Sequence, residues 1–125
     1  MSQNLERLPI FVMAERICDE VWQEVANWSR YDREVMGSQL IRAADSIGAN
    51  IAESHGRFHF AEKINFLYYS RGSLTETIFW LRRCQQRSLV KADQAAHLHR
   101  SLDQLAKEIN AYINYLRNQQ HNTKR

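Results

Sequence analysis

The histidines are the residues whose type could bind a metal ion, and two of them have a spacing that zinc sites use. His55 and His59 are four residues apart, a spacing that on one helix lets two imidazoles chelate zinc. Gly56, a residue typical of helix ends, lies between them, and no further His or Cys follows nearby. The sequence therefore predicts no metal site.

Motifs for nucleophilic catalysis or phosphate binding are absent from the sequence. No serine lies in a Gly-x-Ser-x-Gly turn, and there is no glycine-rich phosphate loop. Paired carboxylates such as Asp19 and Glu20 are typical of a solvated helix face. Cys18 and Cys84 form no Cys-x-x-Cys pair, and their apolar neighbours predict small buried side chains. We therefore expect neither an enzyme nor a bound cofactor.

Two carboxylates, Glu53 and Glu76, stand among apolar or small residues. A partly buried carboxylate needs hydrogen-bond or charge partners. We expect a polar clamp that fixes the second helix against the third, and a ligand pocket is the alternative. The members of the clamp would be Arg42, Asn50, Glu53, Ser73 and Glu76.

Positive charge is concentrated in the second half of the chain. Residues 1–62 hold six Lys and Arg against ten Asp and Glu, a balance of −4. Residues 63–125 hold eleven against four, a balance of +7, so the sum is the net charge of +3. Such asymmetry favours opposed charged surfaces, suited to assembly or to an anionic partner. The alternative is that the two halves pair within the fold.

The basic residues of the second half recur at helical spacings. Arg71 and Arg82 are eleven apart, and Arg100 and Lys107 are seven apart. Such spacings group cations into a phosphate-binding surface, although a solvated bundle face is the alternative. No motif for reading base edges is present, so any binding would be electrostatic. The candidate nucleic-acid contacts are Arg71, Arg82, Arg83, Arg87, Lys91, Arg100 and Lys107.

The elements that must position these residues are helices. The chain has 125 residues, the size of one domain, and its 44% hydrophobic residues suffice for a core. One proline and four glycines are too few for an all-β fold. Apolar spacing predicts helices over about 9–28, 33–55, 58–87 and 93–117, with a frayed tail at 118–125. We expect one all-α domain over 1–125, an antiparallel up-down-up-down four-helix bundle.

Small residues predict a close contact between the second and third helices. Ala43, Ala44 and Gly48 lie on the second helix and Gly72 on the third, and we expect them to set that approach. A bulky residue at position 72 would then overpack the contact. No apolar run approaches the roughly 20 residues of a bilayer span, and the N-terminus lacks the features of an export signal. We therefore expect a cytoplasmic protein that does not enter membranes.

Two motifs resemble those of a known family. The segment 39–53, QLIRAADSIGANIAE, and then Gly56 and Arg57 resemble the signature of the bacterial four helix bundle protein family. That family includes proteins encoded within intervening sequences of large-subunit ribosomal RNA genes. The segment 71–76, RGSLTE, resembles the family's second signature. This chain has Glu53-Ser54 where the family usually has Glu-Gly, a change expected to affect only the helix end.

The resemblance implies an antiparallel four-helix bundle and, as in characterised relatives, a homopentameric barrel. Apolar residues on more than one face of the first and third helices agree with an oligomer; they are Trp22, Trp28, Phe66, Tyr69 and Phe79. The chain is also similar, more remotely, to the accessory variability determinant of diversity-generating retroelements, a basic pentamer that binds nucleic acid and reverse transcriptase.

We therefore predict a non-enzymatic homo-oligomer that binds RNA or DNA electrostatically, with a reverse transcriptase or another protein as a further partner. The alternative is an assembly scaffold that binds a protein partner and no nucleic acid.

Overall fold

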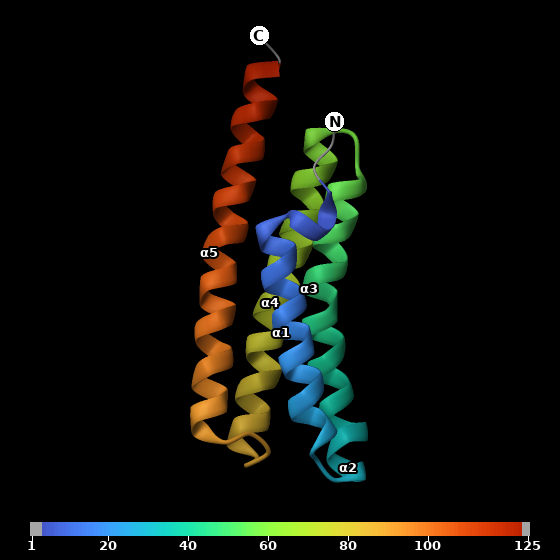
Figure 1. Cartoon of the computed structure of the whole chain (residues 1–125), viewed down its shortest axis with the longest axis vertical. Coiled ribbons are helices and arrows are strands. Elements are labelled where there is room, and N and C mark those ends of the chain that lie inside the picture. The colour runs from blue at the N-terminus through green and yellow to red at the C-terminus, as the bar shows by residue number, and fades with distance from the viewer. Residues whose placement is uncertain (1–3, 124–125) are drawn as a thin grey trace.

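The computed structural model describes residues 4–123, and all regular structure in that range is helical. Its four long helices are α1 (Pro9–Ala26), α3 (Ser38–Gly56), α4 (Phe60–Gln86) and α5 (Ala92–Thr123). Three short ones are η1 (Leu5–Arg7), α2 (Arg30–Asp32) and η2 (Arg33–Gly37). The long helices run alternately down and up the molecule (Figure 1). The predicted all-α, four-helix architecture is confirmed.

Local chemistry explains where the helices begin and end. Pro9 is the first residue of α1, where its missing N–H costs nothing. The Ser29 hydroxyl accepts a hydrogen bond from the Asp32 N–H at 3.2 Å and so caps α2. α3 ends at Gly56, after which Arg57 is extended. The break between His55 and His59 therefore falls where the sequence indicates it.

The second long helix contains a π-helical section. α2, η2 and α3 follow one another without a break from Arg30 to Gly56, and η2 is the wider turn among them. Its last residue, Gly37, is buried against α1. A β-carbon at this position would lie 2.4 Å from Val25 Cγ1. Glycine therefore permits the close approach of the two helices at this end of the bundle.

One apolar core runs the length of the bundle. α5 contributes its seam at three- and four-residue spacing, and α3 and α4 supply the facing side chains. The largest fully buried apolar side chains are Val21, Leu40, Ile47, Ile51, Leu67, Leu81, Leu98, Leu102, Leu105, Ile109 and Ile113. Because these side chains interdigitate between four helices, they hold α4 and α5 at a fixed register.

The end of α5 differs from the expected frayed tail. The helix continues through residues 118–123, while residues 124–125 lie outside the described part of the chain. No glycine or proline follows position 72 in the sequence, so nothing stops the helix once its apolar seam ends at Leu116. The Thr123 hydroxyl donates to the Gln119 carbonyl oxygen at 2.8 Å within the last turn.

The expected role of Gly72 is wrong. Gly72 is exposed, and a β-carbon there would meet no atom within 4 Å. Gly48 faces α1 instead of α4, because its β-carbon would lie 3.7 Å from Ala14 Cβ. α3 and α4 are joined by the buried Ser70 hydroxyl, which donates to the Ile47 carbonyl oxygen at 2.8 Å.

Among the helices of residues 4–123, none combines the length and the apolar composition that a membrane span requires.

Candidate nucleic-acid interface

Two contacts cross between α4 and α5 on one side of this helix pair. Arg71 Nη1 donates a hydrogen bond to Asn110 Oδ1 at 2.9 Å. Eleven residues further along α4, Arg82 lines a surface hollow together with His99 of α5. Because the helices are antiparallel, the eleven residues from Arg71 to Arg82 on α4 run beside the eleven residues from Asn110 back to His99 on α5. The two arginines therefore lie on the same side, about 16 Å apart along the axis.

Tyr68 contacts two arginines on this side of the pair. The guanidinium carbon of Arg71 lies 5.0 Å from the centroid of the Tyr68 ring, and that of Arg117 lies 5.6 Å from it. Arg117 Nη2 also donates a hydrogen bond to the Tyr68 hydroxyl. Cation–π contacts hold a guanidinium group in place without cancelling its charge. Both arginines thus remain available to an anion.

Two further cations lie beside these arginines on α5. Arg100 and Lys107 are exposed and seven residues apart, so they share one face of the helix. Lys107 is also one turn from Asn110, which binds Arg71. The exposed Asp103 is the acid between them. We call this set the basic face; its members are Arg71, Arg82, Arg100, Lys107 and Arg117.

The basic face carries no ion pair. In residues 4–123 the ion pairs are Arg30–Glu34, Arg57–Glu53, Arg57–Glu62 and His97–Glu20. None of these includes a member of the basic face. No described carboxylate of the same chain is therefore within ion-pair distance of the basic face, and Asp103 is the acid that lies among its members.

Three of the seven cations predicted to contact nucleic acid lie elsewhere. Arg87 Nη1 donates to Met36 Sδ at 2.8 Å, which turns it toward η2. Arg83 lies 5.8 Å over the Phe79 ring, and its Nε is buried without a hydrogen-bond partner among the described residues. Lys91 lies in the link between α4 and α5. The structure therefore groups Arg71, Arg82, Arg100 and Lys107 but does not bring the other three to them.

The sequence places Arg117 near Arg100 and Lys107, but the list of seven candidate contacts contains neither Arg117 nor its partner Tyr68. The antiparallel register of α4 and α5 could have identified them. The link after α4 is short, so residues 71 and 110 face each other, as do 82 and 99. Extending that register toward the C-terminus of α5 would have placed Arg117 opposite position 64, one helical turn from Tyr68. Spacing within one helix does not contain this information.

The expected polar clamp is only partly formed. Asn50 Nδ2 is 3.5 Å from Ser73 Oγ and donates more closely, at 2.9 Å, to the Ser46 carbonyl oxygen. Glu53 and Glu76 are exposed and bind residues of their own helix or its end, Arg57 at 3.0 Å and Trp80 Nε1 at 3.2 Å respectively. The exposed Arg42 side chain joins neither carboxylate. These three lie on the solvent side, where partners four residues away are within reach.

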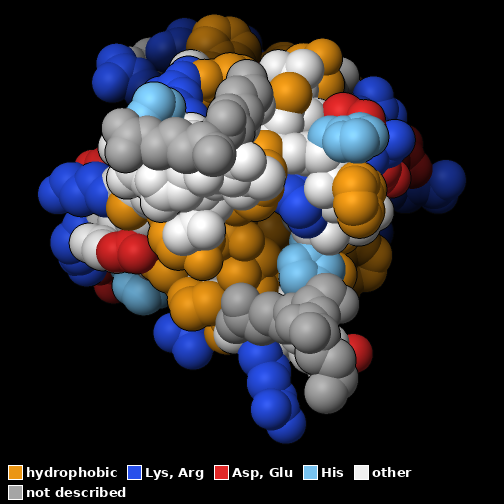
Figure 2. All heavy atoms as spheres, turned by 90° about the horizontal axis from the view of Figure 1, so that it is seen from above, with side chains coloured by type: hydrophobic (Ala, Val, Ile, Leu, Met, Phe, Trp, Pro, Cys, Tyr) orange, Lys and Arg blue, Asp and Glu red, His pale blue; other side chains and the backbone are white. Residues whose placement is uncertain are grey.

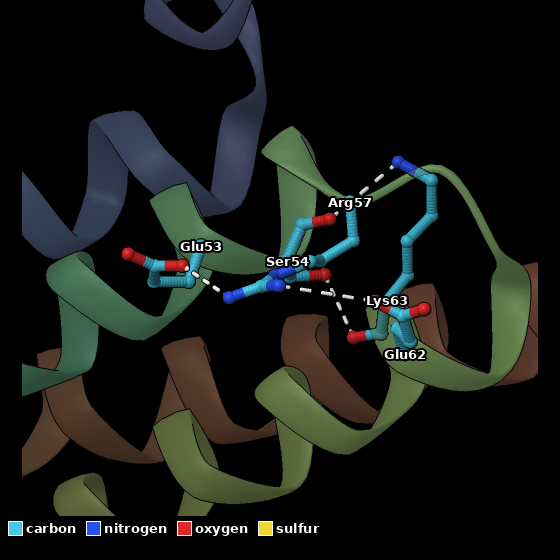
Figure 3. A network of polar contacts seen from close by, with 5 residues as sticks. All are labelled: Glu53, Ser54, Arg57, Glu62 and Lys63. Carbon is cyan, nitrogen blue, oxygen red and sulfur yellow. Dashed lines mark hydrogen bonds and ion pairs between the residues drawn. The ribbon is translucent and has the colours of Figure 1, made fainter.

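A different polar network joins α3 to α4 at their turn (Figure 3). The Ser54 hydroxyl donates to the Lys63 carbonyl oxygen at 2.8 Å, and Lys63 Nζ donates to the His55 carbonyl oxygen at 3.1 Å. Arg57 pairs with Glu53 at 3.0 Å and lies 3.9 Å from Glu62. Burial lowers the pKa of Lys63 below its ordinary value. The ammonium nevertheless favours the end of α3, because helix C-termini carry partial negative charge.

The two thiols are poor nucleophiles in this fold. Burial and, to a smaller extent, the nearby Asp45 raise the pKa of Cys18 to about 12. Cys18 Sγ donates to the Ala44 carbonyl oxygen at 3.3 Å. Burial raises the pKa of Cys84 to about 11. Among the described residues, no three His, Cys, Asp or Glu side chains gather as a metal site would need.

A sequence model of the family described as "23S rRNA-intervening sequence protein" matches residues 6–111. The chain belongs to this family. No curated protein matches the chain. Among solved structures, it resembles the crystal structure of a protein of unknown function from the S23 ribosomal protein family of Bacteroides thetaiotaomicron. The identity is 21%, the TM-score is 0.75, and the match covers 83% of this chain and 97% of the other. This likeness shows the shared fold.

The family match confirms the resemblance seen in the two sequence motifs. Its span includes α1, α3, α4 and the first part of α5. Four members of the basic face lie within the span, whereas Arg117 lies six residues beyond its end. The basic face thus combines residues of the family region with one residue from the C-terminal extension of α5.

Proposed function

We propose that this member of the 23S rRNA-intervening sequence protein family is a non-enzymatic protein that binds RNA or DNA through the basic face. The observation that carries the proposal is the row of cations on α4 and α5 with no carboxylate paired to it in residues 4–123. Contacts to phosphate are the main sequence-independent source of nucleic-acid affinity. The asymmetry of −4 and +7 between the two halves of the chain supports the same function.

The proposal includes a homo-oligomer, and a pentamer is the state that the family resemblance favours. Large apolar side chains are exposed on α1 and α4; Trp22 is 63% exposed and Tyr69 is 58% exposed. Trp22 also borders an open groove of about 860 Å³ between α1 and α3, together with Val25 and Ile41. Apolar patches of this kind mark interaction sites. Repeating a weak site around a ring raises the total affinity through multivalency.

A binding titration at several salt concentrations tests the function. The parent and two double variants are each titrated with single-stranded RNA and with DNA. Arg71→Glu with Arg82→Glu reverses two charges of the basic face, and binding should weaken by at least about tenfold at low salt. Arg16→Glu with Lys91→Glu is the matched control, since it changes the net charge equally at exposed positions outside the face. It should change binding much less.

Light scattering on the same samples measures the oligomer. A mass close to one chain across micromolar concentrations would contradict the oligomer, and equal weakening by both variants would contradict the location of the face. If the parent binds neither RNA nor DNA at low salt, the exposed aromatic residues support the scaffold that binds a protein partner, such as a reverse transcriptase.

A further inference from the structure

A hollow of about 780 Å³ lies at the end of the bundle where α3 passes into α4. It exists because α1 begins at Pro9 while α5 continues well past that level (Figure 1). The last turns of α5 therefore have no part of α1 beside them. Hydrophobic side chains gather in the hollow at this end (Figure 2). The apolar side chains that line it are Leu8, Pro9, Ile10, Phe60, Ala111, Tyr112, Tyr115 and Leu116.

One cation stands at the mouth of this hollow. Lys63 lines it together with His55, and the Lys63 ammonium donates to the carbonyl oxygens of His55 and Ser54. An ammonium has three donors, so one remains. Within the described residues, Lys63 forms no ion pair.

The start of α4 lies at the same end. Phe60, its first residue, lines the hollow, and no side chain caps the helix before it. The first-turn N–H groups of a helix that lack a cap attract anions. Glu62 in the same turn opposes this attraction, so Lys63 is the cation that the hollow offers to an anion.

The acid that lines the hollow lies away from this mouth. Glu108 accepts a hydrogen bond from Gln104 at 3.1 Å. It is eleven residues along α5 from Gln119, which also lines the hollow, and this spacing corresponds to about 16 Å. Gln119 is nearer than Glu108 to the start of α4, because α5 runs toward the end of the bundle where α4 begins (Figure 1). The hollow thus has the Lys63 ammonium at one end and apolar side chains along its length.

We propose that this hollow binds a free single-chain amphiphile with an anionic head group, of the class of medium-chain carboxylates. The carboxylate accepts a hydrogen bond from the Lys63 ammonium, and the alkyl chain lies along Tyr112 and Leu116. The volume falls within the range of about 300–1,000 Å³ that small-ligand pockets occupy. A free molecule fits better than a bilayer surface, because these side chains line a recess.

Calorimetric titration with dodecanoate, kept below the concentration at which it forms micelles, tests the proposal. Saturable binding of one molecule per chain is expected. Dodecyltrimethylammonium has the same chain and the opposite charge, and hexanoate has the same head and a shorter chain. Both should bind at least about tenfold more weakly than dodecanoate, because each lacks one of the two recognised parts.

Three variants locate the site. Lys63→Met removes the ammonium but keeps the stem, and dodecanoate should bind about tenfold more weakly to it, while binding of dodecyltrimethylammonium does not weaken. Lys91→Met is the matched control, because Lys91 is exposed at the other end of α4, and binding should not change. Ala111→Trp places a large ring at an exposed position that lines the hollow, and it should abolish binding of both amphiphiles.

Equal affinity for the two amphiphiles, or unchanged dodecanoate binding by both Lys63→Met and Ala111→Trp, would overturn the proposal. If the protein sediments with phosphatidylglycerol vesicles and dodecanoate does not release it from them, the hollow would be assigned to membrane binding instead. If Lys63→Met unfolds, which circular dichroism reports, the Ala111→Trp comparison decides. The outcome is independent of nucleic-acid binding, since the hollow and the basic face share no residue.

Discussion

Gly37 lies so close to α1 that a β-carbon at its position would come within 2.4 Å of Val25 Cγ1. Both residues are buried at the end of the bundle where α1 turns into α2 and η2. This contact explains why a glycine stands inside a continuous helix, where it costs stability relative to alanine. It also links the π-helical turn to the packing of α1.

Gly37→Ala should lower the free energy of unfolding by about 1–3 kcal/mol, because the added methyl group overlaps the Val25 side chain and forces α1 away. Urea unfolding of both proteins measures the difference. Gly72→Ala is the control, since position 72 is exposed, helical and free of neighbours. That variant should be more stable than the parent by about 0.5–1 kcal/mol. A neutral Gly37→Ala would mean that the two helices are further apart than described.

Ser70→Ala should cost about 1 kcal/mol of stability, because it removes the buried hydrogen bond to the Ile47 carbonyl oxygen that joins α4 to α3. Thermal or urea unfolding gives the value. Ser46→Ala provides the comparison, since the Ser46 hydroxyl donates to Arg42 within its own helix. The Ser46 change should stay within about 0.5 kcal/mol. Equal losses for the two variants would contradict a special role for the link between α3 and α4.

The salt dependence of nucleic-acid binding should reflect the five cations of the basic face. For single strands, the slope of log K against log salt is about −0.7 per phosphate contacted. One chain that uses all five would therefore give a slope near −3.5. Arg117→Gln should reduce the slope by about 0.7, and filter binding between low and physiological salt measures it. An unchanged slope would remove Arg117 from the interface.

Stability should fall as the pH rises above 9, because Cys18 and Cys84 ionise at a lower pH in the unfolded chain than in the fold. Their pKa values are raised by burial to about 12 and about 11, from 9.0. The unfolded state therefore binds fewer protons than the fold in this range, so the free energy of unfolding falls as the pH rises. Tyr112, whose pKa burial also raises, acts in the same direction. Lys63 acts oppositely, since its pKa is lowered.

The double variant Cys18→Ala/Cys84→Ala isolates the thiols. Between pH 9 and 11 its free energy of unfolding should fall less steeply than that of the parent, although it starts lower because the core side chain at position 84 is smaller. Urea unfolding at each pH gives both slopes. Parallel slopes would show that the thiols keep ordinary pKa values in the fold.

The helices were predictable because their apolar side chains repeat at the period of the helix. Leu98 to Leu116 form a seam that reads directly as one buried face of α5. The end of that helix was not predictable from the seam, since residues 118–123 continue it with polar side chains and no breaker. Periodicity reports burial, whereas helix length also depends on backbone hydrogen bonds, which polar residues can also form.

The candidate interface was only half predictable, because it depends on how two helices face each other. Arg71 and Arg82 share a face by spacing alone, whereas Arg117 reaches Tyr68 across the helix pair. Arg87 has a suitable position in the sequence but turns toward Met36. The prediction of the polar clamp was wrong for a related reason. Glu53 and Glu76 bind side chains four residues away in the sequence and not side chains on the facing helix.

The unequal lengths of α1 and α5 divide the amide protons of α5 into two classes. Those between Leu98 and Ile113 lie over fully buried side chains, so they exchange with solvent deuterium only when the whole bundle opens. Those of residues 118–123 belong to turns that have no α1 beside them, and their protection comes from the helix–coil equilibrium of the last turns alone. Along this single helix, hydrogen exchange should therefore change from opening of the whole bundle to fraying of the helix end within about two turns after Leu116.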